Sequence, residues 1–268
     1  MKLIPVNVGS LANANSEDAA WPAVNVLDPK IKKCWKAASD SVVDATLNLT
    51  ITSGADSLAV FGVVADQIVL TISDPNLVEW EAGTEWEAGT EWVVVTQGET
   101  QAVLQADMVN SGADSVGGIK GAAWFQFASL GGTVEADIRV MNTTGRVMRL
   151  SVGTVFAGTR IEGTKFKPGL STDLIDHSIE RELANGAIYY KKREINREFS
   201  GTLLPADADA HEQFWQVHRR YGRVPMPYVL IDDSGPQWLI MGRMQAMTAK
   251  EDNNAIYNPI DITIREES

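Results

Sequence analysis

The segment Asp44–Thr52 reads DATLNLTIT, and its alternation of polar and apolar residues decides the fold class of the first half of the chain. The apolar residues recur at every second position: Ala45, Leu47, Leu49 and Ile51. A period of two residues is typical of a strand with one buried face, because successive side chains point to opposite faces of a sheet. The segment therefore predicts a half-buried β-strand.

Further strand signals lie C-terminal to this segment. The run Ser57–Val64 is continuously apolar, which predicts a strand buried on both faces, and Gln67–Ser73 ends at the turn sequence Asp74-Pro75-Asn76. Four more strands are predicted between turn sequences, at Glu91–Thr96, Gly121–Ala128, Val134–Met141 and Val147–Val155. Many short strands separated by turns predict a jelly-roll β-sandwich.

The pattern changes near residue 160, where charged residues become denser. Residues 206–221 predict a helix that ends before Gly222. Its apolar positions recur at helical spacing: Ala210, Phe214, Val217 and Tyr221. Strands are predicted on both sides of it, at Arg193–Leu204, Tyr228–Asp232, Trp238–Ala246 and Pro259–Arg265. The sequence thus predicts a mainly β protein with two domains, a sandwich at 1–158 and a small α+β domain of one helix on an antiparallel sheet at 159–268.

Composition narrows the function classes. The net charge of −12 argues against nucleic-acid binding as the main role, because phosphate contacts need clustered Lys and Arg. The longest apolar runs are far shorter than the ~20 residues of a membrane span, and no secretory signal opens the chain. The single cysteine, Cys34, cannot form an intrachain disulfide. We expect a soluble protein with no nucleic-acid partner and no membrane insertion.

The sequence contains no recognisable catalytic or metal-binding motif. The three histidines, His177, His211 and His218, do not have the spacing of a zinc protease, and none lies in the half that contains Cys34. The acidic cluster at 79–91 fits a solvated edge better than the differently tuned carboxylates of a glycosidase. We therefore expect no enzyme activity, no catalytic residues, no cofactor and no metal, with glycan hydrolysis as the least favoured alternative.

A short motif near the start carries a resemblance. Trp21–Asp28 reads WPAVNVLD, and a second tryptophan, Trp35, follows it. This pattern resembles the opening of the discoidin-like, galactose-binding-like jelly rolls, and the resemblance covers roughly residues 10–157. It implies an eight-stranded sandwich whose end loops can hold carbohydrate. The motif itself is structural in that family, so the resemblance implies structural roles for Trp21, Asn25 and Asp28.

A tandem repeat supplies the carbohydrate-binding candidates. The sextet EWEAGT occurs at residues 79–84 and 85–90, and Glu91-Trp92 follows. An extended segment would place Trp80, Trp86 and Trp92 on one side, where stacked rings suit sugar faces or a partner surface. A duplicated loop insertion is the favoured alternative, because surface loops tolerate insertions well.

The galactose-binding-like domains also occur in phage tail-tip and baseplate proteins, and the second half is loosely similar to domains of tail-tube and distal-tail proteins. The resemblance implies a structural subunit of a bacteriophage tail tip or baseplate, made in the host cytoplasm and located in the virion. Its implied partners are other tail proteins and copies of itself in a symmetric ring, with contact to host-surface glycan as an open additional role. The alternative is a carbohydrate-binding module that acts as a host adhesin without a structural role.

Two further features are candidate contacts with protein partners. A basic segment after Tyr189-Tyr190 is predicted to bind an acidic partner, such as a neighbouring subunit; it comprises Lys191, Lys192, Arg193 and Arg197. The terminal segments Met1–Gly9 and Ile256–Ser268 could pair with neighbours by strand addition.

Overall fold

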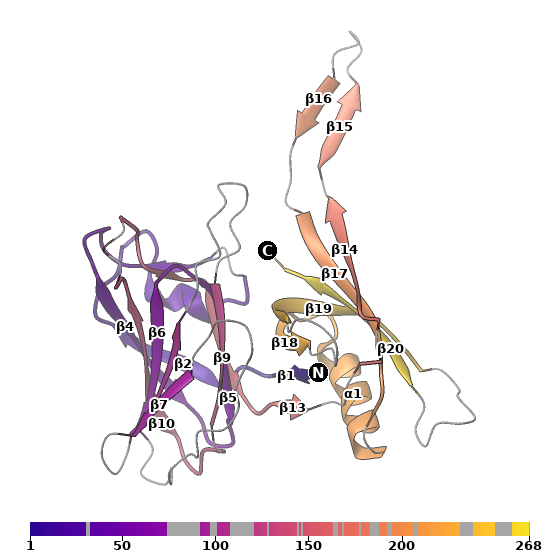
Figure 1. The fold of residues 1–268 in the computed structure, drawn as a ribbon, viewed down its shortest axis with the longest axis horizontal. Helices are drawn as coiled ribbons and strands as arrows, with labels where there is room; N and C mark the ends of the chain where they lie inside the picture. The colour runs from indigo at the N-terminus through magenta and orange to yellow at the C-terminus, as the bar shows by residue number, and fades with distance from the viewer. Residues whose placement is uncertain are drawn as a thin grey trace. The chain divides into compact units, whose positions relative to one another are not determined.

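The computed structural model describes residues 1–30, 33–73, 92–96, 101–107, 121–127, 129–143, 145, 147–162, 166–167, 169–176, 178–182, 188–191, 195–205, 208–230, 238–249 and 259–267. The chain divides into two compact units, of which one is Ile4–Arg160 and the other comprises Met1–Leu3 and Ile161–Ser268 (Figure 1). The first three residues thus belong to the C-terminal unit, although the sequence placed them in the sandwich.

The N-terminal unit is an antiparallel β-sandwich. Its strands form a six-stranded sheet in the order β2-β4-β10-β6-β8-β7, a three-stranded sheet β12-β5-β9 and the pair β11-β3. The strands are β2 Gly9–Ala14, β3 Trp35–Lys36, β4 Asp44–Ile51, β5 Ser57–Val63, β6 Gln67–Ser73, β7 Trp92–Thr96, β8 Gln101–Asp107, β9 Gly121–Gln126, β10 Val134–Met141, β11 Ser151–Val152 and β12 Thr154–Gly158. A 3-10 helix, η1 Ala23–Leu27, precedes β3.

The core of the sandwich confirms the alternation predicted from the sequence. Every second residue of β4 is buried, from Ala45 to Ile51, and β10 pairs with β4 from Val134↔Ile51 to Met141↔Asp44. Each fully buried Leu or Ile stabilises the fold by roughly 1.5–3 kcal/mol. Strand β5 is buried at all its positions, as its continuous apolar run predicts.

One predicted strand differs from the structure. The stretch 147–155 was expected to be a single strand, but Val147 is 90% exposed and regular pairing begins only at Ser151. The Arg149 side chain ties this stretch to the segment around Ala37, because its Nε donates to the carbonyl of Ala37. The short strand β11 then ends before Gly153, and β12 follows.

The described residues of the C-terminal unit form a seven-stranded antiparallel sheet, a separate two-stranded hairpin and one helix, which confirms the predicted fold class. The sheet order is β13-β1-β18-β19-β20-β17-β14, and β15 and β16 form a separate hairpin. The elements are β1 Lys2–Leu3, β13 Ile161–Glu162, β14 Ser171–Asp176, β15 Ile179–Glu182, β16 Ile188–Lys191, β17 Ile195–Leu203, α1 Ala208–Tyr221, β18 Met226–Leu230, β19 Trp238–Ala249 and β20 Ile260–Glu266.

Helix α1 covers the apolar face of this sheet. Ala210, Phe214 and Val217 are buried as predicted, whereas Tyr221 is only partly buried. Gly222 follows the helix in a tight space, because a Cβ there would lie 2.5 Å from the carbonyl oxygen of His218. This steric limit explains why glycine occupies the position at which the sequence predicts the end of the helix.

Both terminal segments are paired within the C-terminal unit. Strand β1 lies between β13 and β18, and β20 lies between β19 and β17. The prediction that these ends add strands to neighbouring proteins is therefore wrong for the terminal strands, because their backbone groups already serve this sheet.

Candidate functional site

The C-terminal unit presents an exposed ribbon, defined here as strands β14, β15 and β16. Strand β14 pairs with β17 from Ser171↔Ser200 to Asp176↔Ile195 and is the last strand of the described sheet. The hairpin β15–β16 lies between β14 and β17 in the sequence. Figure 1 shows this hairpin extending beyond β14 and β17 and away from α1.

Strand β14 brings an apolar side chain to the edge of the sheet that the described residues form. Its residues are exposed except for Ile175, which is half-buried, and the side chain of Leu174 is 71% exposed. Leu174 on β14 pairs with Arg197 on β17. Arg197 lies two positions before Phe199, so both side chains lie on the same face of β17, and Phe199 is fully buried. The apolar face of the sheet therefore continues past its core to an exposed edge, and an edge strand is a ready template for pairing with another chain.

The hairpin presents apolar side chains on both faces. Three consecutive residues of β16, Ile188, Tyr189 and Tyr190, are 67%, 49% and 57% exposed. Because successive strand residues point to opposite faces, neither face of the hairpin is buried at these positions. An isolated two-stranded hairpin is marginally stable in water, and grouped exposed apolar residues mark interaction sites.

Of the four cations predicted to bind a partner, one is exposed, one is paired within the C-terminal unit and two lie outside the described residues. Lys191 is exposed at the end of β16, opposite Ile179. The Arg197 guanidinium instead binds Glu266 on β20 in a bidentate pair, with Nε–Oε2 at 2.7 Å and Nη2–Oε1 at 2.6 Å. The hydrogen bond to Glu266 raises the pKa of Arg197 against the opposing effect of burial. Lys192 and Arg193 lie outside the described residues.

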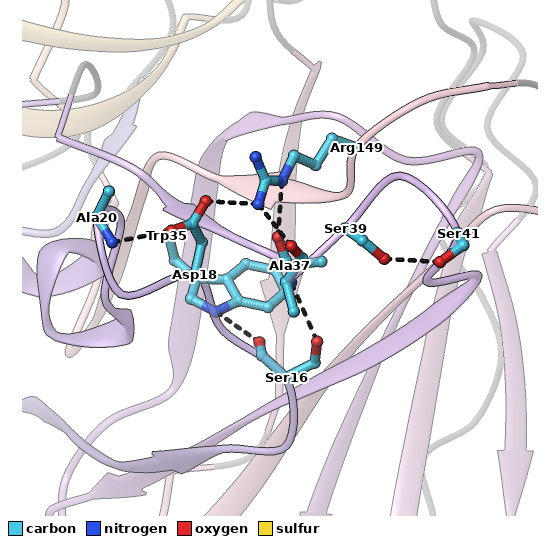
Figure 2. Close-up of polar contacts among 9 residues, drawn as sticks. Ser16, Asp18, Ala20, Trp35, Ala37, Ser39, Ser41 and Arg149 are labelled. Atoms are coloured by element: carbon cyan, nitrogen blue, oxygen red, sulfur yellow. Dashed lines mark hydrogen bonds and ion pairs between the residues drawn. The ribbon is translucent and has the colours of Figure 1, made fainter.

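A polar network closes the loops around the motif of the N-terminal unit, as Figure 2 shows. The Trp35 indole donates to the carbonyl of Ser16 at 3.0 Å, and Arg149 donates both to the Asp18 carboxylate at 2.5 Å and to the carbonyl of Ala37 at 2.8 Å. The hydrogen bond from the Ala20 backbone N–H, followed by the charge of Arg149, lowers the pKa of Asp18. These contacts hold the loops together.

The motif residues make intramolecular contacts, which supports the structural roles that the resemblance implies. The Asn25 side-chain amide donates to the carbonyl of Cys34 at 3.1 Å, and the thiol of Cys34 is buried. The Asp28 carboxylate accepts from the Lys30 backbone N–H at 2.9 Å and from Lys33 Nζ at 2.7 Å. These bonds fix the turn after η1.

The carbohydrate candidates are not tested by the structure. Trp80 and Trp86 lie outside the described residues, and only the backbone of Trp92 is described, in β7. The prediction that these tryptophans bind sugar therefore stays a prediction.

The histidines of helix α1 lie beside an aromatic ring. His211 Nε2 is 3.4 Å from the indole nitrogen of Trp215, and the rings of both His211 and His218 lie edge-on to that indole at 6.4 Å. His177 lies outside the described residues. Within the described ranges, no three His, Cys, Asp or Glu side chains gather as metal ligands, and no helix is long and apolar enough to cross a membrane.

Part of this site was missed by sequence reasoning. The basic segment pointed to the C-terminal end of the hairpin, but neither Leu174 nor Ile188 was singled out. The available signal was the pair Tyr189-Tyr190, since adjacent aromatics in a strand place one ring on each face.

Comparisons with known proteins add weak similarities. No family model matches this sequence, and a search of curated proteins finds no match. A chain from the structure of reduced XRCC1 bound to the DNA polymerase β catalytic domain is 14% identical, at a TM-score of 0.39 over 59% of this chain and 98% of that chain. Chitosan-binding module 1 from a chitosanase/glucanase of Paenibacillus sp. IK-5 is 13% identical, at a TM-score of 0.34 over 57% of this chain and 97% of that chain. A selenomethionine-labelled mutant of the same module is 10% identical, at a TM-score of 0.36 over 59% of this chain and 98% of that chain. At these scores the fold assignment rests on the strand pairing above.

Proposed function

We propose that this chain is a structural subunit of a bacteriophage tail tip or baseplate, which assembles with copies of itself and with neighbouring tail proteins. The observation that carries the proposal is the exposed ribbon, with Leu174 on its edge strand and Ile188, Tyr189 and Tyr190 on its hairpin. The galactose-binding-like motif in the N-terminal unit supports the tail-tip setting. A structural subunit of this kind is located in the virion.

The chemistry of the ribbon suits protein association better than solvent exposure. Tyrosine is enriched in the buried centres of protein interfaces, where its ring supplies apolar contact at a low entropic cost. Fully burying one large apolar side chain is worth roughly 1.5–3 kcal/mol. Three such side chains in one hairpin can therefore supply much of the free energy that association costs.

The test removes the apolar side chains of the hairpin and leaves its backbone unchanged. The variant Ile188→Ser/Tyr189→Ser/Tyr190→Ser is compared with wild type in sedimentation velocity. A matched control, Val24→Ser/Val43→Ser/Val147→Ser, removes three side chains of the N-terminal unit that are 62%, 57% and 90% exposed. We expect wild type and control to form oligomers and the hairpin variant to lose them.

A second measurement tests the tail setting. Mass spectrometry of purified virions from a phage that encodes this chain should detect it among the tail proteins. A wild-type chain that stays monomeric at every concentration and is absent from virions would contradict the proposed function.

Contact with host-surface carbohydrate is a second candidate role, and the N-terminal unit is where we propose it. The support is the motif Trp21–Asp28, whose Asn25 and Asp28 make structural contacts in a β-sandwich, together with the tryptophan repeat in the sequence. Glycan-array binding of wild type and of Trp80→Ala/Trp86→Ala/Trp92→Ala tests it. Binding by wild type that survives in the triple variant would remove these tryptophans as the sugar site.

A further inference from the structure

The two faces of the β15–β16 hairpin have opposite charge. The register pairs Glu180 with Tyr190 and Ile179 with Lys191, and paired residues share a face. Glu180, Tyr190 and the position of Ile188 therefore lie on one face, whereas Tyr189 and Lys191 lie on the other. By the same register, Glu182 occupies a position on the first face and Arg181 one on the second.

Each face thus combines apolar groups with a single sign of charge. The first, which we name the acidic face, presents the exposed Glu180 with Tyr190 and Ile188. The second, the basic face, presents the exposed Lys191 with Tyr189. Both faces therefore present a tyrosine ring next to a charged side chain near the same end of the hairpin. The charge is negative on one face and positive on the other.

We propose that the acidic face of one hairpin binds the basic face of the hairpin in the next copy of this chain. The inference rests on the proposed function, because it names the contact through which the copies assemble. Charge complementarity selects a second copy as the occupant, since each hairpin provides both halves of the contact. The tyrosines and Ile188 lose their exposure in this contact, and Glu180 and Lys191 face residues of opposite sign.

The proposal fixes the kind of symmetry. Two unlike faces make a head-to-tail contact, which generates a closed ring or an open filament. A two-fold dimer would place like faces together, and like charges in direct contact repel. A ring of identical copies is the closed form of this arrangement.

Charge reversal tests the contact in the full-length chain. Glu180→Lys places lysine opposite lysine at every contact, and Lys191→Glu places glutamate opposite glutamate. We expect each single variant to weaken association by about tenfold per contact, because an attractive pair becomes a repulsive one. The double variant Glu180→Lys/Lys191→Glu restores an opposite pair at each contact, so its oligomers should return.

An equimolar mixture of the two single variants provides a sharper test. At the two contact positions, 180 and 191, the Glu180→Lys copy carries lysine on both faces and the Lys191→Glu copy carries glutamate on both, so opposite charges meet there only when the two variants alternate. We expect the mixture to form oligomers with alternating copies that neither variant forms alone. Glu135→Lys on β10 and Arg223→Glu after α1 serve as controls, because both residues are exposed and lie outside the hairpin. Circular dichroism spectra and thermal unfolding verify that each variant is folded.

The outcomes separate this inference from the proposed function. Wild type that forms no oligomers contradicts both. Oligomers of wild type that persist unchanged in both single variants overturn the hairpin contact alone. Single variants that dissociate without recovery in the double variant or in the mixture also overturn it, because the charges would then act on a different partner surface.

Discussion

The side chains of the loop network in the N-terminal unit bond to one another and to nearby backbone groups, whereas the apolar side chains of the ribbon in the C-terminal unit are exposed. Around Trp35, the indole, the Asp18 carboxylate and the Arg149 guanidinium all bond to groups of the same unit. On the ribbon, Leu174, Ile188 and the two tyrosines remain exposed. Residues that stand out in a sequence can thus serve the fold, whereas less conspicuous apolar residues remain exposed on the surface.

The largest loss of stability is expected on substitution of Trp35, at the centre of the loop network. Trp35→Ala removes a side chain that is fully buried and should destabilise the N-terminal unit by about 3–5 kcal/mol, because a cavity replaces the ring. Chemical denaturation measures the change. Trp35→Phe, which keeps most of the apolar volume but loses the bond to Ser16, is the control and should cost less. Equal losses in the two variants would contradict the role assigned to packing.

A smaller effect is expected at Arg197, which the sequence grouped with the partner-binding cations. Arg197→Gln breaks the bidentate pair with Glu266 and should destabilise the C-terminal unit by about 2 kcal/mol, because it leaves a part-buried carboxylate without its cation. Thermal unfolding measures the loss, and Arg223→Gln, at an exposed residue outside the hairpin, is the control with unchanged stability. An Arg197→Gln chain that unfolds like wild type would show that the pair is not structural.

The sequence predicted much of the fold because the decisive signals are local. The alternation in β4 and the spacing of Ala210, Phe214 and Val217 follow directly from burial on one face. The ribbon was missed because an exposed strand has no buried face to impose a period, and STDLID in β14 shows none. The Arg197–Glu266 pair joins residues 69 positions apart, so only the sheet order reveals it.

A smaller effect is expected in how the stability of the N-terminal unit depends on acid pH, through Asp18 of the loop network. The folded-state pKa of Asp18 lies below its ordinary value of 3.8, so the carboxylate contributes stability above that value and loses the contribution as pH falls through the folded-state pKa. Asp18→Asn should therefore lower stability at neutral pH and flatten its decline below about pH 4. Unfolding midpoints across acid pH measure both changes. Identical pH profiles would remove Asp18 from the network.

The smallest effect on stability is expected at the ribbon edge. Leu174→Ser should change the free energy of unfolding by less than about 0.5 kcal/mol, because the side chain is 71% exposed. Association should weaken all the same if the edge of β14 takes part in it. Thermal unfolding and sedimentation of the same sample measure both properties. A marked loss of stability would mean that Leu174 belongs to the core of the folded unit.

The central claim is that the hairpin, and not the closed network, is where this protein meets its partners. Sedimentation velocity of the full-length chain tests it most directly, with wild type beside Ile188→Ser/Tyr189→Ser/Tyr190→Ser. The account predicts oligomers for wild type and folded monomers for the hairpin variant. Oligomers of equal size and strength in both proteins would contradict it.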